Sequence, residues 1–172
     1  MKNLILLFGI FVLGLTSCET NSVNSTPNSL DVSGDYVLTS LVADVAVDFN
    51  NDGQTDTELM NETTCFDSWD VQFMASGDFT ANITDSTFDT NNQLQCTANT
   101  ASGTYSFDPA TDVLTVTIAV NGGSVTESKA VTFTPTTFSF TLDSQDVANY
   151  MPNLTGTPAS NISQLDFTYT KI

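Results

Sequence analysis

The sequence predicts an all-β domain in which about eight short antiparallel strands form an up-and-down barrel. The composition is rich in Thr, Ser, Asn, Val and Phe, and apolar residues alternate with polar ones over short runs. Turn signals such as Ser76-Gly77-Asp78 and Asn121-Gly122-Gly123 separate these runs. A β-sandwich is the alternative, but its Greek-key crossovers need longer connections than most of those present here.

The expected strands follow one another along the chain, with a long loop at 48–64 after the first of them. Residues 69–75 carry the clearest alternation, which places their apolar side chains on one face. The polar stretch 96–103 predicts a loop, and a short helix is expected at 146–151. The expected strands are 36–42, 69–75, 79–84, 104–107, 113–119, 125–133, 138–142 and 165–171.

The charge balance excludes several classes of function. The chain has 20 acidic residues, three basic ones and no histidine, for a net charge of −17. Such a surface repels polyanions, so no nucleic acid partner is expected. Without histidine there is no Ser-His-Asp or Cys-His nucleophile. We expect a non-enzymatic protein without an organic cofactor; the alternative is a hydrolase that uses paired carboxylates such as Asp67 and Asp70. The oligomeric state is not predicted.

The N-terminus combines one cation, Lys2, with an apolar run over 4–14 and then Leu15-Thr16-Ser17-Cys18. The run is shorter than the ~20 residues that a membrane-spanning helix needs. This pattern resembles a bacterial lipoprotein signal peptide with its lipobox. The resemblance implies cleavage after 1–17, lipidation of Cys18 and a flexible tether at 18–31. It implies a cell-envelope lipoprotein of the outer membrane, held by its lipid anchor, on a face that the sequence leaves open.

The order of several short motifs over 32–172 resembles the lipocalin-like domain of Bacteroidetes lipoproteins. Gly34-Asp35-Tyr36-Val37-Leu38-Thr39-Ser40 is similar to that family's opening strand, with Tyr36 where Trp is usual. Cys65-Phe66-Asp67 and the later Gly103-Thr104-Tyr105 match two further segments, and Phe167-Thr168-Tyr169-Thr170-Lys171 matches the last strand. The resemblance implies an up-and-down β-barrel that binds a small hydrophobic ligand or a partner in the envelope.

The segment Asp48-Phe49-Asn50-Asn51-Asp52-Gly53-Gln54-Thr55-Asp56 is similar to the calcium loops of EF-hands. Oxygen donors would come from Asp48, Asn50, Asp52, the Gln54 carbonyl and Asp56. The usual bidentate Glu at position 12 is replaced by Leu59, so Glu58 or Glu62 would have to serve instead. The segment predicts either a structural calcium site or an acidic surface loop without an ion, and the barrel could then be filled and bind no small ligand.

Cys65 and Cys96 are the thiols that remain in the exported domain. Because export implies an oxidising compartment, we expect a disulfide between them in preference to free thiols, a metal pair or a catalytic cysteine. Aromatic residues at strand spacing predict core packing, and some of them are candidates for the wall of a ligand cavity. These candidates are Trp69, Phe73, Phe79, Tyr105, Phe138, Phe140, Phe167 and Tyr169.

Overall fold

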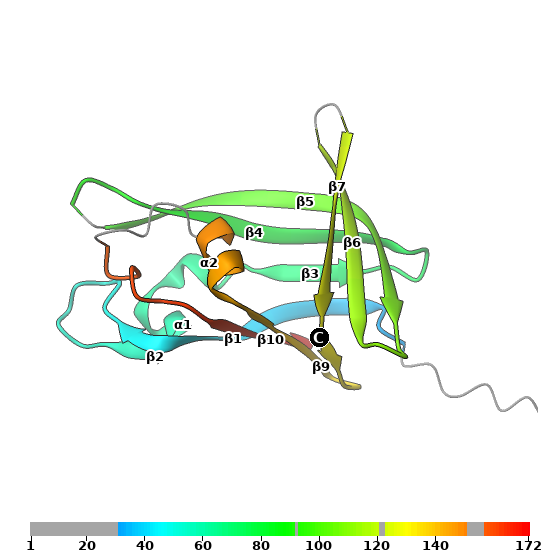
Figure 1. Cartoon of the computed structure of the whole chain (residues 1–172), viewed down its shortest axis with the longest axis horizontal. Helices are drawn as coiled ribbons and strands as arrows, with labels where there is room; N and C mark the ends of the chain where they lie inside the picture. Colours follow the sequence, from blue (N-terminus) through cyan, green and yellow to red (C-terminus); the bar gives the residue numbers. More distant parts are fainter. Residues whose placement is uncertain (1–30, 92, 121–122, 151–156) are drawn as a thin grey trace, which may run out of the picture.

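The computed structural model describes residues 31–91, 93–120, 123–150 and 157–172. Within them, ten antiparallel strands form one curled sheet, the half-barrel of Figure 1, in the order β7-β6-β5-β4-β3-β1-β10-β9-β8, with β2 paired to β1. The predicted all-β antiparallel fold is confirmed. The strands are β1 (Gly34–Val47), β2 (Asp56–Glu58), β3 (Asp70–Phe73), β4 (Asp78–Phe88), β5 (Leu94–Asp108), β6 (Val113–Val120), β7 (Gly123–Ala130), β8 (Thr132–Phe133), β9 (Thr137–Leu142) and β10 (Leu165–Lys171).

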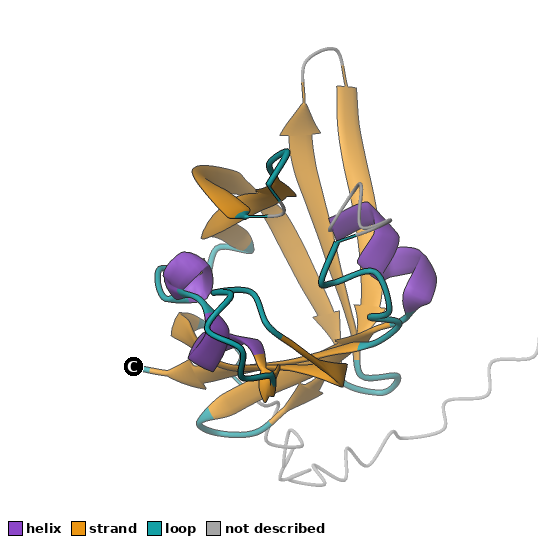
Figure 2. Cartoon of the chain, turned by 90° about the vertical axis from the view of Figure 1, so that its left-hand side faces the viewer, coloured by secondary structure: helices purple, strands orange, loops and turns teal. Residues whose placement is uncertain are grey.

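Within the described residues, three short helices lie in the connections between strands. The α-helix α1 (Leu59–Glu62) and the 3-10 helix η1 (Thr64–Phe66) occupy the long link between β1 and β3, whereas α2 (Ser144–Tyr150) follows β9. Figure 2 shows α2 beside the upright β6–β7 hairpin. In the described part of the chain, no helix has the length and apolar character needed to cross a membrane.

One side of the half-barrel is packed with aromatic side chains. The register of β9 and β10 pairs Phe138 with Tyr169 and Phe140 with Phe167. The rings stack in both pairs, with centroids 4.6 Å and 4.7 Å apart. Tyr36 on β1 meets Phe138 edge-on at 5.1 Å. Such cross-strand aromatic pairs stabilise a sheet by more than the apolar area that they bury. We call this part of the fold, with its aromatic side chains on β1, β9 and β10, the packed side.

The sheet turns a corner on β5. The first part of β5 pairs with β4 as far as Thr104, and the part from Gly103 onward pairs with β6. The two ladders therefore overlap over only a short length, and β6 and β7 stand across the direction of β4 and β5 in Figure 1. At the corner, a Cβ placed on Gly103 would lie 2.0 Å from the backbone oxygen of Thr117. This close backbone approach needs a residue without a side chain.

The two ends of the strand order, β7 and β8, do not pair with each other in the described residues. We call this interruption the seam. The link residue Val131 donates its N–H to the Asp112 carbonyl at 2.8 Å, which ties the link to the β5–β6 turn and separates β7 from β8. The expectation of one strand over 125–133 is therefore wrong, and the break at Val131 is the reason.

The polar stretch 96–103 is strand and not the expected loop. The register pairs Cys96 with Ser86 and continues without a break to Gly103 opposite Phe79. Most side chains from Cys96 to Thr100 are exposed, so their polarity reflects solvent on this part of the hairpin and not a loop. β1 is likewise longer than expected because its second half pairs with β10 and β2.

Candidate functional site

The concave side of the sheet encloses an apolar cavity of about 330 Å³. It lies between the wall formed by β3 to β6 and the facing strand β9, with β7 and α2 at its margin. Its apolar wall consists of Val71, Phe73, Phe79, Ala81, Ile83, Ala101, Leu114, Val116, Ile118, Val131, Phe138, Phe140, Leu142 and Tyr169. Glu127, Ser128, Lys129 and Asp146 complete the lining.

Small side chains explain why this side of the half-barrel is not filled. Ala81 pairs with Ala101 across β4 and β5, so two alanines face the interior side by side. Leu114 and Val116 on β6 line the same cavity and are only half-buried, unlike the buried Phe138 opposite. Side chains of barrel interiors commonly close this space. Here the wall of β4 to β6 stays partly accessible from inside.

The predicted aromatic residues fall into two groups. Those on the cavity wall are Phe73, Phe79, Phe138, Phe140 and Tyr169. Trp69 and Phe167 instead stack on each other at 6.1 Å in the packed side. Tyr105 donates its hydroxyl to the Met74 carbonyl at 2.9 Å, and burial raises the pKa of Tyr105 above its ordinary value. These three residues do not line the cavity.

Charged side chains lie at the cavity margin along the seam. The register places Lys129 opposite Leu114 and Glu127 opposite Val116, so both charged residues of β7 share the interior face with the apolar side chains of β6. The Lys129 ammonium forms an ion pair with the Asp146 carboxylate of α2. Both side chains are partly exposed, at 36% and 31%. The pair joins α2 to β7 across the seam.

The sequence contains a signal for these margin residues in the hairpin turn that precedes β7. The turn at Asn121-Gly122-Gly123 predicts a hairpin, and a hairpin register fixes which residues share a face. Continuing the alternation from Leu114 and Val116 through such a turn places Glu127 and Lys129 on the same face. The residues between the two strands, 121–122, lie outside the described part of the chain.

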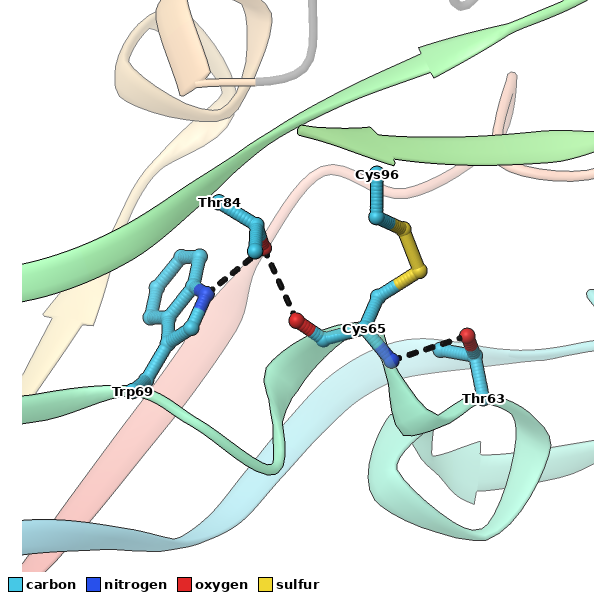
Figure 3. The surroundings of a disulfide bond; sticks show 5 residues. All are labelled: Thr63, Cys65, Trp69, Thr84 and Cys96. Carbon is cyan, nitrogen blue, oxygen red and sulfur yellow. Dashed lines mark hydrogen bonds between the residues drawn. A yellow bond between two sulfur atoms is a disulfide. The ribbon is translucent and has the colours of Figure 1, made fainter. Parts of the chain in front are cut away.

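The predicted disulfide is confirmed, with Cys65 of η1 bonded to Cys96 of β5 and their Cα atoms 5.7 Å apart. Figure 3 shows the hydrogen bonds around it. The Thr84 hydroxyl donates to the Cys65 carbonyl at 2.9 Å and accepts from the Trp69 indole N–H at 2.7 Å. The Cys65 N–H donates to the Thr63 hydroxyl at 3.2 Å. The bond therefore attaches the β4–β5 hairpin to the packed side of the fold.

The acidic loop at 48–56 is held by hydrogen bonds of its own. The Asp48 carboxylate accepts from the N–H groups of Asp52 and Gly53 at 3.1 Å and 2.9 Å. The side-chain oxygens of Asn50 and Asp52 each accept a hydrogen bond from the backbone N–H two residues further along the chain. Asn51 and Gly53 adopt left-handed φ angles of 59° and 86° that close the turn. These hydrogen bonds fix the turn of the loop.

The remaining donors of the predicted calcium set are engaged elsewhere. The Glu58 N–H and the Asn61 amide hold the pKa of Asp56 below its ordinary value. Glu58 accepts from Ser40 and Leu41, and buried Glu62 accepts from the Phe49 N–H. Among the residues that the structure describes, no three acidic or cysteine side chains are placed to hold a metal ion. The donor types in the predicted set are those that suit calcium.

Calcium binding at this loop stays a prediction, which calorimetry can test. If the loop takes up calcium, a titration at millimolar calcium gives heat in the wild-type protein and none in Asp48→Asn, because that variant loses a carboxylate ligand. The control is Asp67→Asn, which removes one carboxylate outside the loop. If none of the three proteins gives heat, the prediction of calcium binding is wrong and the loop is only a hydrogen-bonded turn.

The carboxylates considered for acid–base chemistry do not meet in the cavity. Both oxygens of Asp70 accept from the Asn82 amide at 3.0 Å, whereas Asp67 is exposed at the end of η1. Neither residue is part of the cavity lining. The structure does not bring this pair to a common cleft.

Comparison with known proteins adds no relative. No protein-family model, no curated protein and no solved structure matches the chain.

Proposed function

We propose that this chain is a membrane-anchored, lipocalin-like lipoprotein whose half-barrel binds a small hydrophobic ligand. The observation that carries the proposal is the unfilled apolar cavity of about 330 Å³ on the concave side of the sheet. Binding pockets for small molecules are concave, mostly apolar and about 300–1,000 Å³ in volume, with a few polar groups that set orientation. The cavity meets this description.

The anchor part of the proposal rests on the N-terminal sequence. Residues 1–17 and Cys18 lie outside the described residues, so their support is the lipobox pattern alone. Two acyl chains on one cysteine give stable attachment to a membrane, where a single chain would bind only weakly. We propose the outer membrane as the location. A strongly acidic domain has no affinity of its own for anionic lipid surfaces, so the acyl chains supply the attachment.

The alternative is a structural or interaction module with a filled interior, stiffened by calcium. The aromatic side of the fold fits that alternative, because its rings leave little space. The opposite wall does not fit it, since Ala81 and Ala101 leave the interior open. The half-buried apolar side chains of β6 give an apolar ligand a surface to cover.

Binding of the uncharged dye Nile red, followed by its fluorescence, tests the proposed function. We expect wild-type protein to bind the dye and dodecanol to displace it. Ala101→Leu fills part of the cavity, and excluding about two methylene groups of ligand corresponds to a roughly tenfold weaker affinity. The matched control is Ala119→Leu on β6, where Ala119 is exposed and not part of the lining.

Two results would contradict the proposed function. One is a wild-type protein that binds neither the dye nor dodecanol. The other is equal loss of binding in Ala101→Leu and Ala119→Leu, which would show that the dye binds a surface and not the cavity. Far-UV circular dichroism on each variant checks that the sheet is intact.

A further inference from the structure

We infer that the cavity takes an amphiphile with a cationic head group, which the Glu127 carboxylate binds at the margin. This inference rests on the proposed function and adds the charge class of the ligand. Three properties of the margin support it: the charged side chains that line it, the ion pair between two of them, and the negative charge of the rest of the domain.

Glu127, Lys129 and Asp146 are the charged side chains of the lining. Lys129 and Asp146 neutralise each other as an ion pair. Among the described residues, the structure shows no hydrogen bond or ion pair for the Glu127 side chain, and that side chain is exposed. The uncompensated charge at the margin is therefore one negative charge, on the carboxylate of Glu127.

Glu127 is placed to meet a ligand head while the chain of the ligand lies in the cavity. It shares its sheet face with Val116 directly opposite on β6, and Val116 belongs to the apolar wall. Lys129 is two residues further along β7 on the same face, about 7 Å away along the strand. An amphiphile whose tail contacts the β6 wall thus has its head within reach of Glu127 without displacing the Lys129–Asp146 pair.

An anionic head is disfavoured by the same geometry. To pair with Lys129 it would have to share the ammonium with Asp146 or displace it, and in either case it would lie beside the carboxylates of Asp146 and Glu127. The net charge of −17 also opposes the approach of an anion. A neutral head group is neither repelled by these carboxylates nor attracted by the negative charge of the domain. A cationic head is attracted by the domain and finds a carboxylate beside an apolar wall, where the attraction is stronger than in bulk water.

An exposed Glu on an edge strand also has a simpler explanation, because inward-pointing charges protect sheet edges from pairing with other chains. That explanation makes no distinction between ligand heads. The cationic-head inference predicts that dodecylammonium binds more tightly than dodecanol, and dodecanol more tightly than dodecanoate. This difference in ranking separates the two explanations.

Displacement of Nile red by these three twelve-carbon compounds is the test, with dodecanol kept below its solubility limit and the two charged compounds below their micelle concentrations. In the wild-type protein we expect dodecylammonium to bind about fivefold more tightly than dodecanol, as for one partly screened ion pair. Glu127→Gln should remove this advantage, so that the ratio of dodecylammonium affinity to dodecanol affinity falls to about one. Asp67→Asn removes the same charge away from the cavity and should keep most of the advantage. Added salt should reduce the advantage in wild type.

The outcomes are distinguishable from a failure of the proposed function. If dodecanol displaces the dye but dodecylammonium binds no better, or Glu127→Gln behaves as wild type, the cationic-head inference is wrong and the hydrophobic site stands. If Asp67→Asn loses as much of the dodecylammonium advantage as Glu127→Gln does, the attraction comes from the charge of the whole domain. The role inferred for Glu127 would then be wrong. If no compound displaces the dye, the proposed function itself fails.

Discussion

Gly103→Ala is expected to destabilise the domain by about 3 kcal/mol or more, or to prevent its folding. The new Cβ would lie 2.0 Å from the Thr117 oxygen and 2.9 Å from the Thr117 carbonyl carbon. Both are backbone atoms of β6, so no side chain can rotate away to relieve the contact. β5 changes its pairing partner at this residue, and the substitution therefore forces the two ladders apart at the corner of the sheet.

Urea unfolding followed by circular dichroism measures this effect. The matched control is Gly123→Ala at the start of β7, where an added Cβ meets nothing within 4 Å. We expect that control to change the free energy of unfolding by less than about 0.5 kcal/mol. Equal stability of the two variants would show that the corner at Gly103 does not constrain the fold.

Removing the disulfide is the second change with a large expected effect. Cys65 and Cys96 are 31 residues apart in the sequence, and in the chain-entropy model a closed loop of that size contributes roughly 3–4 kcal/mol. We expect Cys65→Ala/Cys96→Ala to lower the free energy of unfolding by about this amount. The loss arises because the unfolded chain regains the freedom that the bond removes, while Thr84 still connects β4 to Cys65 and Trp69 in the folded state.

A reducing agent supplies the control for this prediction. It should destabilise the wild-type protein by a similar amount and leave the double variant unchanged, because the variant has no bond to reduce. Titration of the unreduced, denatured wild type with a thiol reagent should detect neither cysteine. A double variant as stable as the oxidised protein would contradict the prediction.

The fold class followed from local patterns that the structure keeps. The alternation over 69–75 placed Trp69, Val71, Phe73 and Ala75 on one face; the first three are buried, whereas Ala75 is exposed in the turn after β3. The pairing of Cys65 with Cys96 was predicted from the oxidising compartment that the N-terminal sequence implies. Both inferences depend on features that are short in sequence, which is why a single chain reveals them.

Other features depend on contacts between distant segments. Residues 96–100 have the composition of a loop, but pairing with β4 makes them strand, since the backbone hydrogen bonds of a hairpin do not require apolar side chains. The break at Val131 depends on its bond to Asp112, 19 positions earlier by number. Composition could not tell which aromatic residues of the core also line the cavity, because all of them have the same alternation.

The seam has a consequence for the width of the molecule. In a closed barrel, the number of strands and their stagger fix the diameter. Here the run of paired strands begins at β7 and ends at β8, and the link residue Val131 joins the β6–β7 hairpin to β8, which pairs with β9. The aromatic stacks hold β9 and β10 together, and the hairpin is attached to them through the corner at Gly103, the Val131 link and the Lys129–Asp146 pair. Within the described part of the chain, the two walls of the cavity are therefore joined at the seam by one link residue and one ion pair, in place of a row of backbone hydrogen bonds between β7 and β8.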